Sequence, residues 1–217
     1  MYRIAIYEEP LRVKGIQTIL GDTCEVTYSA GDFQTLQYRP PSDVQVVLLS
    51  SALPEADSSP ELANVYRVLK FLQGKCLFTS FVVICHPNTA AQPAILAHYP
   101  RVRAILTPDK LFSELDSAIT CAAIGKRYYS ASGAKLPKVI RLSKEDCALL
   151  RAFYAEPSVK VAAQKTGVSP QVAYRRLKGM IRGLGASGYK TLPQRAQDLG
   201  VVAFGEVVNP YYVAQST

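Results

Sequence analysis

Residues 161–185 read VAAQKTGVSPQVAYRRLKGMIRGLG, and this stretch predicts the fold of the second half of the 217-residue chain. Gly167 ends a short helix, because glycine readily adopts the left-handed conformation that follows a last helical turn. Ser169 and Pro170 begin the next helix with a capping hydroxyl and a proline at its first position. Gly185 ends that second helix. Two short helices joined by such a turn are typical of a helix-turn-helix.

The second of these helices, residues 170–184, has an apolar face formed by Ala173, Leu177, Met180 and Leu184. Its other face carries Gln171, Tyr174, Arg175, Lys178 and Arg182. The two sets project to opposite sides because successive residues are turned by about 100°. A major groove admits an α-helix and is read by long side chains of this kind, so these five residues are predicted to contact double-stranded DNA. The alternative is a basic face of a core helix that meets only solvent.

The second half also carries all of the formal net charge of +8. Residues 1–130 hold 12 Lys and Arg against 12 Asp and Glu, whereas residues 131–217 hold 13 against 5. A neutral region joined to a basic one suggests that the basic part meets a polyanion, most often nucleic acid. Charge alone is equally compatible with a basic surface that binds nothing.

The lengths of the apolar runs and the spacing of the cysteines indicate the class of protein and its cellular compartment. The longest apolar runs, residues 46–49 and 81–85, are far shorter than the ~20 residues of a membrane span. The first residues lead into Glu8 and Glu9 without a basic start or a cleavage site, so no signal peptide is expected. The five cysteines are odd in number and have no metal-ligand spacing. We therefore expect a cytoplasmic protein with no membrane partner, no bound metal and no cofactor.

The first 125 residues alternate strand and helix patterns. Strands are expected over 2–7, 24–28, 43–49, 81–85 and 103–107, with helices over 11–20, 60–73, 89–99 and 111–124. This order implies an α/β fold with a doubly wound parallel sheet and helices on both faces. Chemistry in such folds belongs at the carboxyl ends of the strands. Those ends carry Glu8, Glu9, Ser50, Cys85 and Thr107.

A small, polar, proline-marked stretch separates the two halves. It predicts a linker over 130–139, between a domain of residues 1–129 and an all-α domain of residues 140–217. The tail VVAFGEVVNPYYV, residues 201–213, is too apolar for a free chain end. We expect the tail to pack on the second domain or on a partner subunit.

The stretch 142–186 resembles the LuxR-type helix-turn-helix of NarL-family response regulators. The resemblance is carried, without gaps, by Leu142, Ser143, Leu150, Ser158, Ala163, Gly167, Val168, Ser169, Leu184 and Gly185. It implies that Tyr174, Arg175 and Lys178 face the major groove. Val172 and Ala173 stand where the family has a Thr-Val pair, and Arg176 stands where it has His.

The first half is similar to the receiver domain of the same family, a flavodoxin-like fold, through residues 4–20 and 46–54. The resemblance places Ser50 at the phosphorylated aspartate and Glu8 and Glu9 at the acidic pair. Cys85 stands where receivers have Thr or Ser, and Thr107 or Pro108 stands where they have Lys. A serine hydroxyl cannot form an acyl phosphate and is not an anionic Mg²⁺ ligand. We therefore expect a degenerate phosphoacceptor pocket in a pseudo-receiver domain.

Together these features predict a transcription regulator of the response-regulator type, related to two-component systems. A single recognition helix reads few bases, so a homodimer, or a heterodimer with another receiver-type regulator, is expected. No nucleophile–base pair indicates an enzyme. The alternative is an auxiliary interaction module that pairs with another receiver-type regulator and reads little DNA itself.

Overall fold

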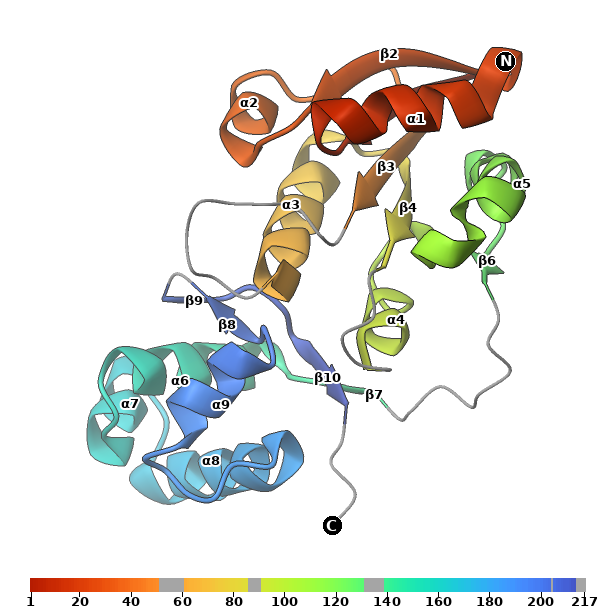
Figure 1. Cartoon of the computed structure of the whole chain (residues 1–217). Coiled ribbons are helices and arrows are strands. Elements are labelled where there is room, and N and C mark those ends of the chain that lie inside the picture. Colours follow the sequence, from red (N-terminus) through yellow and green to blue (C-terminus); the bar gives the residue numbers. More distant parts are fainter. Residues whose placement is uncertain (51–60, 86–90, 131–138, 204, 214–217) are drawn as a thin grey trace. The chain divides into compact units, whose positions relative to one another are not determined.

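The computed structural model describes residues 1–50, 61–85, 91–130, 139–203 and 205–213 (Figure 1). The chain divides into two compact units, Met1–Lys135 and Leu136–Thr217. Most of the predicted linker, residues 131–138, lies outside the described residues. Across the described ranges, no helix is long and apolar enough to span a membrane.

A six-stranded parallel sheet forms the centre of the first unit. Its strands, in spatial order, are β2 (Cys24–Ala30), β1 (Tyr2–Tyr7), β3 (Val46–Ser50), β4 (Ser80–Ile84), β5 (Val102–Leu106) and β6 (Tyr128–Tyr129). Every residue of β3 is buried, as are four of the five in β4. Continuous apolar strands of this kind need cover on both faces. The flavodoxin-like α/β class is therefore confirmed.

Helices cover the two faces of this sheet. They are α1 (Pro10–Leu20), α2 (Phe33–Tyr38), α3 (Glu61–Lys75), α4 (Ala91–Leu96) and α5 (Leu111–Ala123), with short 3-10 helices η1 (Gly21–Thr23) and η2 (Pro108–Lys110). One continuous core joins α1 and α5 to the sheet. Figure 1 shows α3 on the other side of the strands.

Two details of the first unit are not evident from the sequence. Within the helix predicted over 11–20, Leu11 is 83% exposed and Val13 is buried. The short helix α2 was not predicted, because six residues show too little periodicity. The carboxylate of Asp32 caps α2 by accepting the Thr35 backbone N–H at 2.7 Å.

In the described part of the second unit, four helices pack around one core. They are α6 (Lys144–Ala155), α7 (Val159–Thr166), α8 (Pro170–Leu184) and α9 (Leu192–Asp198). Leu149, Leu150 and Phe153 of α6 are buried together with the apolar face of α8. Ser143 caps α6 by accepting the Asp146 N–H at 3.0 Å.

Short strands complete the second unit, which is therefore not purely helical. They are β7 (Val139–Arg141), β8 (Val202–Ala203), β9 (Glu206–Val207) and β10 (Tyr211–Val213), and they pair antiparallel as β7 with β10 and β8 with β9. The apolar tail thus packs on its own unit, one of the two outcomes expected from its composition. Tyr212 is 6% exposed, and its ring lies against Gly183 of α8.

Candidate functional site

The helix-turn-helix is formed by α7, a three-residue turn and α8. Ser158 caps α7 by accepting the Val161 N–H at 3.4 Å, and Ser169 caps α8 by accepting the Val172 N–H at 3.3 Å. Between the helices, Gly167 has a φ of 70°, the left-handed conformation that suits glycine. These local features fix where α8 begins, and they match the start and stop signals in the sequence.

The two faces of α8 are separated as its spacing predicts. The buried residues are Ala173, Leu177, Met180 and Leu184. The exposed residues include all five predicted DNA contacts, Gln171, Tyr174, Arg175, Lys178 and Arg182. Their roles toward DNA stay a prediction.

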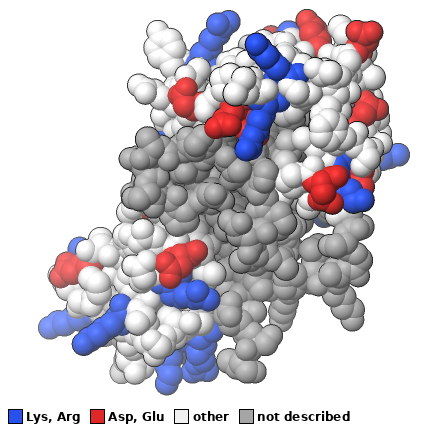
Figure 2. Space-filling model, viewed as in Figure 1, with Lys and Arg blue, Asp and Glu red and all other residues white. Residues whose placement is uncertain are grey.

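The exposed face of α8 is electropositive. The helix contains no Asp or Glu, and within the described ranges Arg175, Lys178 and Arg182 form no ion pair. Figure 2 shows Lys and Arg side chains projecting from the part of the second unit where α8 lies. Unpaired cations on one face leave their charge available to a polyanion.

Two other arginines, one on α8 and one on α9, stabilise the fold instead. The Arg176 guanidinium lies 3.2 Å from the Asp146 carboxylate and ties α8 to the start of α6. Arg195 of α9 donates from Nε to the Leu184 carbonyl at 3.0 Å, which satisfies an unpaired carbonyl at the end of α8. Sequence reasoning identified neither role, because both partners are distant in the chain.

The predicted phosphoacceptor residues do meet at one edge of the sheet. Glu8 follows Tyr7 at the end of β1, and Tyr7 pairs with Leu49, so Glu8 lies level with Ser50 at the end of β3. The backbone N–H of Cys85, after β4, donates to the Leu106 carbonyl, so Cys85 lies beside Thr107.

Burial differs among the members of this edge. The Glu8, Ser50 and Cys85 side chains are buried, whereas Glu9 and Thr107 are partly exposed. Among the described residues, the edge therefore brings together two glutamates, a serine, a thiol and a threonine.

An arginine occupies the neighbourhood of the acidic pair. The Arg12 guanidinium lies 3.7 Å from a carboxylate oxygen of Glu8 and 3.7 Å from one of Glu9. It follows these residues at i+4 and i+3 on the first turn of α1, a spacing that brings side chains together. The Glu9 N–H also donates to the Glu8 carboxylate at 2.9 Å. The single charge of Arg12 thus offsets part of the charge of the acidic pair. No group of His, Cys, Asp and Glu that could hold a metal ion occurs in the parts of the chain that the structure describes.

A groove opens beside this acidic pair, between α1 and the η2–α5 segment. Its lining residues are Glu8, Arg12, Gly15, Ile16, Ile19, Ile84, Pro108, Leu111 and Phe112. Phe112 is 81% exposed, and Leu11 on the first turn of α1 is 83% exposed. Apolar side chains are thus presented to solvent on this part of the first unit, although the apolar stripe of α5 itself is buried in the core.

Comparison with known proteins supports the fold. No protein-family model matches the chain, and no curated protein matches it in sequence. A structure of RcsB dimers bound to parallel DNAs has a TM-score of 0.54 and 21% identity, covering 91% of this chain and 98% of that chain. A structure of the RcsB response regulator from Salmonella typhimurium has a TM-score of 0.53 and 19% identity, covering 89% and 98%. A structure of a two-component response regulator RcsB–DNA complex has a TM-score of 0.52 and 19% identity, covering 91% and 98%. The chain therefore shares the two-part architecture of these structures.

Proposed function

We propose that this chain is a DNA-binding transcriptional regulator whose helix α8 reads the major groove. The observation that carries the proposal is the division of α8 into a buried apolar face and an exposed face whose three cations form no ion pair with any described residue. The DNA-bound structures that share the fold support it. The role is regulatory, not enzymatic, and we place it in the cytoplasm.

The exposed residues of α8 divide by position and chemistry. Arg175 lies one turn from the capped start of α8, where recognition helices approach base edges most closely, and its planar fork can hold guanine O6 and N7 together. Arg182 lies in the last turn and suits a phosphate. Lys178 lies between these two arginines on the same face. Gln171 lies one turn before Arg175.

A salt titration with two duplexes tests this division. The duplexes are one selected by the protein from a randomised pool and a scrambled version. Arg175→Ala should cost about 1–3 kcal/mol on the selected duplex and little on the scrambled one. Arg182→Ala should weaken both alike and reduce the salt slope by about 1. If Arg175→Ala binds both duplexes like the parent, α8 is not the reading element and the auxiliary-module function takes precedence.

We further infer that the first unit acts without an aspartyl-phosphate switch. Ser50 offers no carboxylate, and Arg12 already offsets part of the charge of Glu8 and Glu9. Incubation with acetyl phosphate and Mg²⁺ should leave the intact mass unchanged, and Mg²⁺ should not shift the melting temperature. A base-labile adduct of one phosphoryl group would contradict this inference.

The first unit instead supplies an association surface in this proposal, for a homodimer or a heterodimer with another receiver-type regulator. Phe112 lines the α1–η2–α5 groove and is 81% exposed, which supports it, because exposed apolar side chains at a groove mark interaction sites. Replacing Phe112 by Ser should lower the molar mass seen by light scattering. Phe78→Ser is the matched control, since Phe78 is 97% exposed but does not line the groove.

A further inference from the structure

A row of three aromatic rings runs from the core of the second unit to the exposed face of α8. Phe153 of α6 is buried, and its ring centroid lies 6.1 Å from that of Tyr189 with the rings edge to face. Tyr189 follows α8, and its ring lies 5.5 Å from that of Tyr174, tilted by 37°. Tyr174 is 51% exposed. The middle ring therefore connects a fixed core residue to one of the predicted DNA contacts.

The loop that carries Tyr189 is held by its own hydrogen bonds. The Gly188 N–H donates to the Thr191 hydroxyl at 3.1 Å, and the Leu192 N–H donates to the Gly188 carbonyl at 3.1 Å. The Ser187 and Thr191 hydroxyls lie 3.0 Å apart. The Tyr189 hydroxyl reaches back to α8 and donates to the Tyr174 carbonyl at 3.3 Å. Tyr189 is thus held by the hydrogen bonds of its loop, by its own hydroxyl and by the contacts of its ring with Phe153 and Tyr174.

A ring that is held in this way limits the freedom of its neighbour. A half-exposed tyrosine on a helix would otherwise exchange between rotamers, and ordering it on binding would cost entropy. Here the Tyr189 ring packs against Tyr174 before DNA arrives, while about half of Tyr174 stays accessible. Burial, followed by the hydrogen bond and charge of Tyr174, raises the pKa of Tyr189 above its ordinary value, so this ring stays neutral in binding experiments.

We propose that Tyr189 is a positioning residue, which orients Tyr174 for an apolar contact with a thymine methyl group in the major groove. The inference rests on the proposed DNA-reading function and adds a residue outside the recognition helix to it. Thymine is the base that presents a methyl group in that groove, and apolar side-chain atoms are its partners. Aromatic pairs contribute beyond buried area, so loss of the Tyr189 ring should be measurable.

The experiment compares the full chain and its variants on three kinds of duplex. These are the duplex selected by the parent, a scrambled version, and selected duplexes in which each thymine in turn is replaced by uracil, which lacks the methyl group. The parent should lose affinity at one thymine position. Tyr189→Leu should bind the selected duplex about 3- to 10-fold more weakly, bind the scrambled duplex like the parent, and no longer distinguish thymine from uracil at that position.

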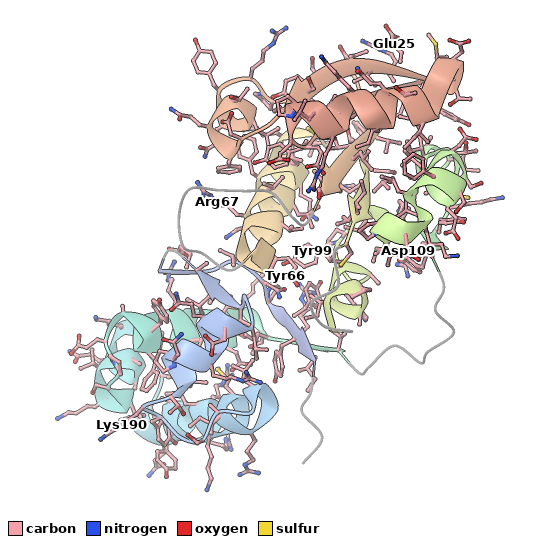
Figure 3. The ribbon with its side chains drawn as sticks, in the orientation of Figure 1. Glu25, Tyr66, Arg67, Tyr99, Asp109 and Lys190 are labelled. Carbon is pink, nitrogen blue, oxygen red and sulfur yellow. The ribbon has the colours of Figure 1, made fainter. Side chains whose placement is uncertain are left out.

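Two control variants separate positioning from stability and from charge. Tyr154 is also a half-buried tyrosine but lies on α6, and its hydroxyl donates to Gln197 at 3.2 Å. The Tyr154→Leu variant should keep the sensitivity to the methyl group. Lys190→Ala removes the exposed charge beside Tyr189, which projects outward in Figure 3, and it should weaken both duplexes alike. In a Tyr174→Leu background, Tyr189→Leu should have no additional effect on discrimination.

The ratio of affinities for the selected and scrambled duplexes does not depend on the folded fraction, so a less stable variant still tests the inference. Tyr189→Phe keeps the ring and should keep the sensitivity to the methyl group. If Tyr189→Leu retains that sensitivity, or if the parent binds specifically but responds to no thymine, the positioning role is wrong and the proposed function stands. If the parent has no preferred duplex, the proposed function fails together with the inference.

Discussion

Replacing Gly183 by alanine tests how closely the C-terminal strand packs on α8. A Cβ atom at this position would lie 2.9 Å from Cε2 and 3.0 Å from Cζ of Tyr212, and nearer still to its hydroxyl. The strand of Tyr212 is paired with β7, and the ring is 6% exposed, so it has little room to move. Gly179 lies one turn earlier on the same helix and would have nothing within 4 Å of its Cβ. It is therefore the matched control.

Two opposing effects set the size of the change. Alanine is favoured over glycine inside a helix by about 0.5–1 kcal/mol, so Gly179→Ala should stabilise the second unit by that amount. Gly183→Ala makes the same gain but overpacks the contact with Tyr212, which typically costs about 1–3 kcal/mol. The gain in helix stability from replacing glycine by alanine is common to both variants. We therefore expect Gly183→Ala to be less stable than Gly179→Ala by about 1–3 kcal/mol.

Hydrogen–deuterium exchange of α8 peptides in the full chain measures this difference, because it reports the opening of the second unit separately from the first. Tyr212→Phe removes the hydroxyl that lies nearest to the added methyl group. In the Gly183→Ala background this change should recover part of the lost protection, a coupling expected of residues in contact. Equal protection of α8 in the two alanine variants would refute the packing of Tyr212 on this helix.

Three further predictions concern local stability. The Thr35 backbone N–H, and then its hydroxyl, lower the pKa of Asp32 below its usual range. Because solvent screens this exposed carboxylate, Asp32→Ala should lose about 0.5 kcal/mol at neutral pH, the low end for a helix cap. Because the folded state favours the carboxylate, this contribution is present above about pH 4 and is lost as the pH falls, and urea unfolding of parent and variant should converge in acid. Ser169→Ala should lower the stability of the second unit by about 1 kcal/mol and Ser169→Asp should not, as α8 exchange rates would show. Deleting residues 211–217 removes β10 and should speed exchange in β7 and α8; unchanged rates would contradict the strand pairing.

Helices and strands long enough to repeat their apolar pattern several times could be predicted from the sequence. Elements of only two or three residues could not. Helix α8 begins and ends where Ser169 and Gly185 predict, because both signals are local. The strands β6, β7 and β10 span two or three residues, and each exists only through a partner that is distant in sequence. The exposed position of Leu11 shows a related limit. At the start of a helix, a few apolar residues define more than one possible stripe, and tertiary packing selects among them.

The candidate site was predictable to the same extent. Spacing alone separated the exposed residues of α8 from the buried ones. It did not distinguish Arg175 from Arg176, because the partner of Arg176 is Asp146, 30 residues earlier in the chain. The contact of Tyr189 with Tyr174 is hidden in the same way. The ion pairs of Arg12 with Glu8 and Glu9 could have been predicted, since Arg12 follows these residues at the i+4 and i+3 spacings in the sequence.

The pairing of β7 with β10 has a mechanical consequence for the second unit. The strands are antiparallel and pair Val139 with Val213 at one end, so the entering and leaving chains lie side by side. A force that pulls β7 and β10 apart breaks the three residue pairs one after another. It does not load all three pairs at once, as a shearing force along the strands would. The second pair to open joins Ile140 to Tyr212, whose ring rests on Gly183. Tension on either chain end therefore reaches α8 after a single residue pair has parted.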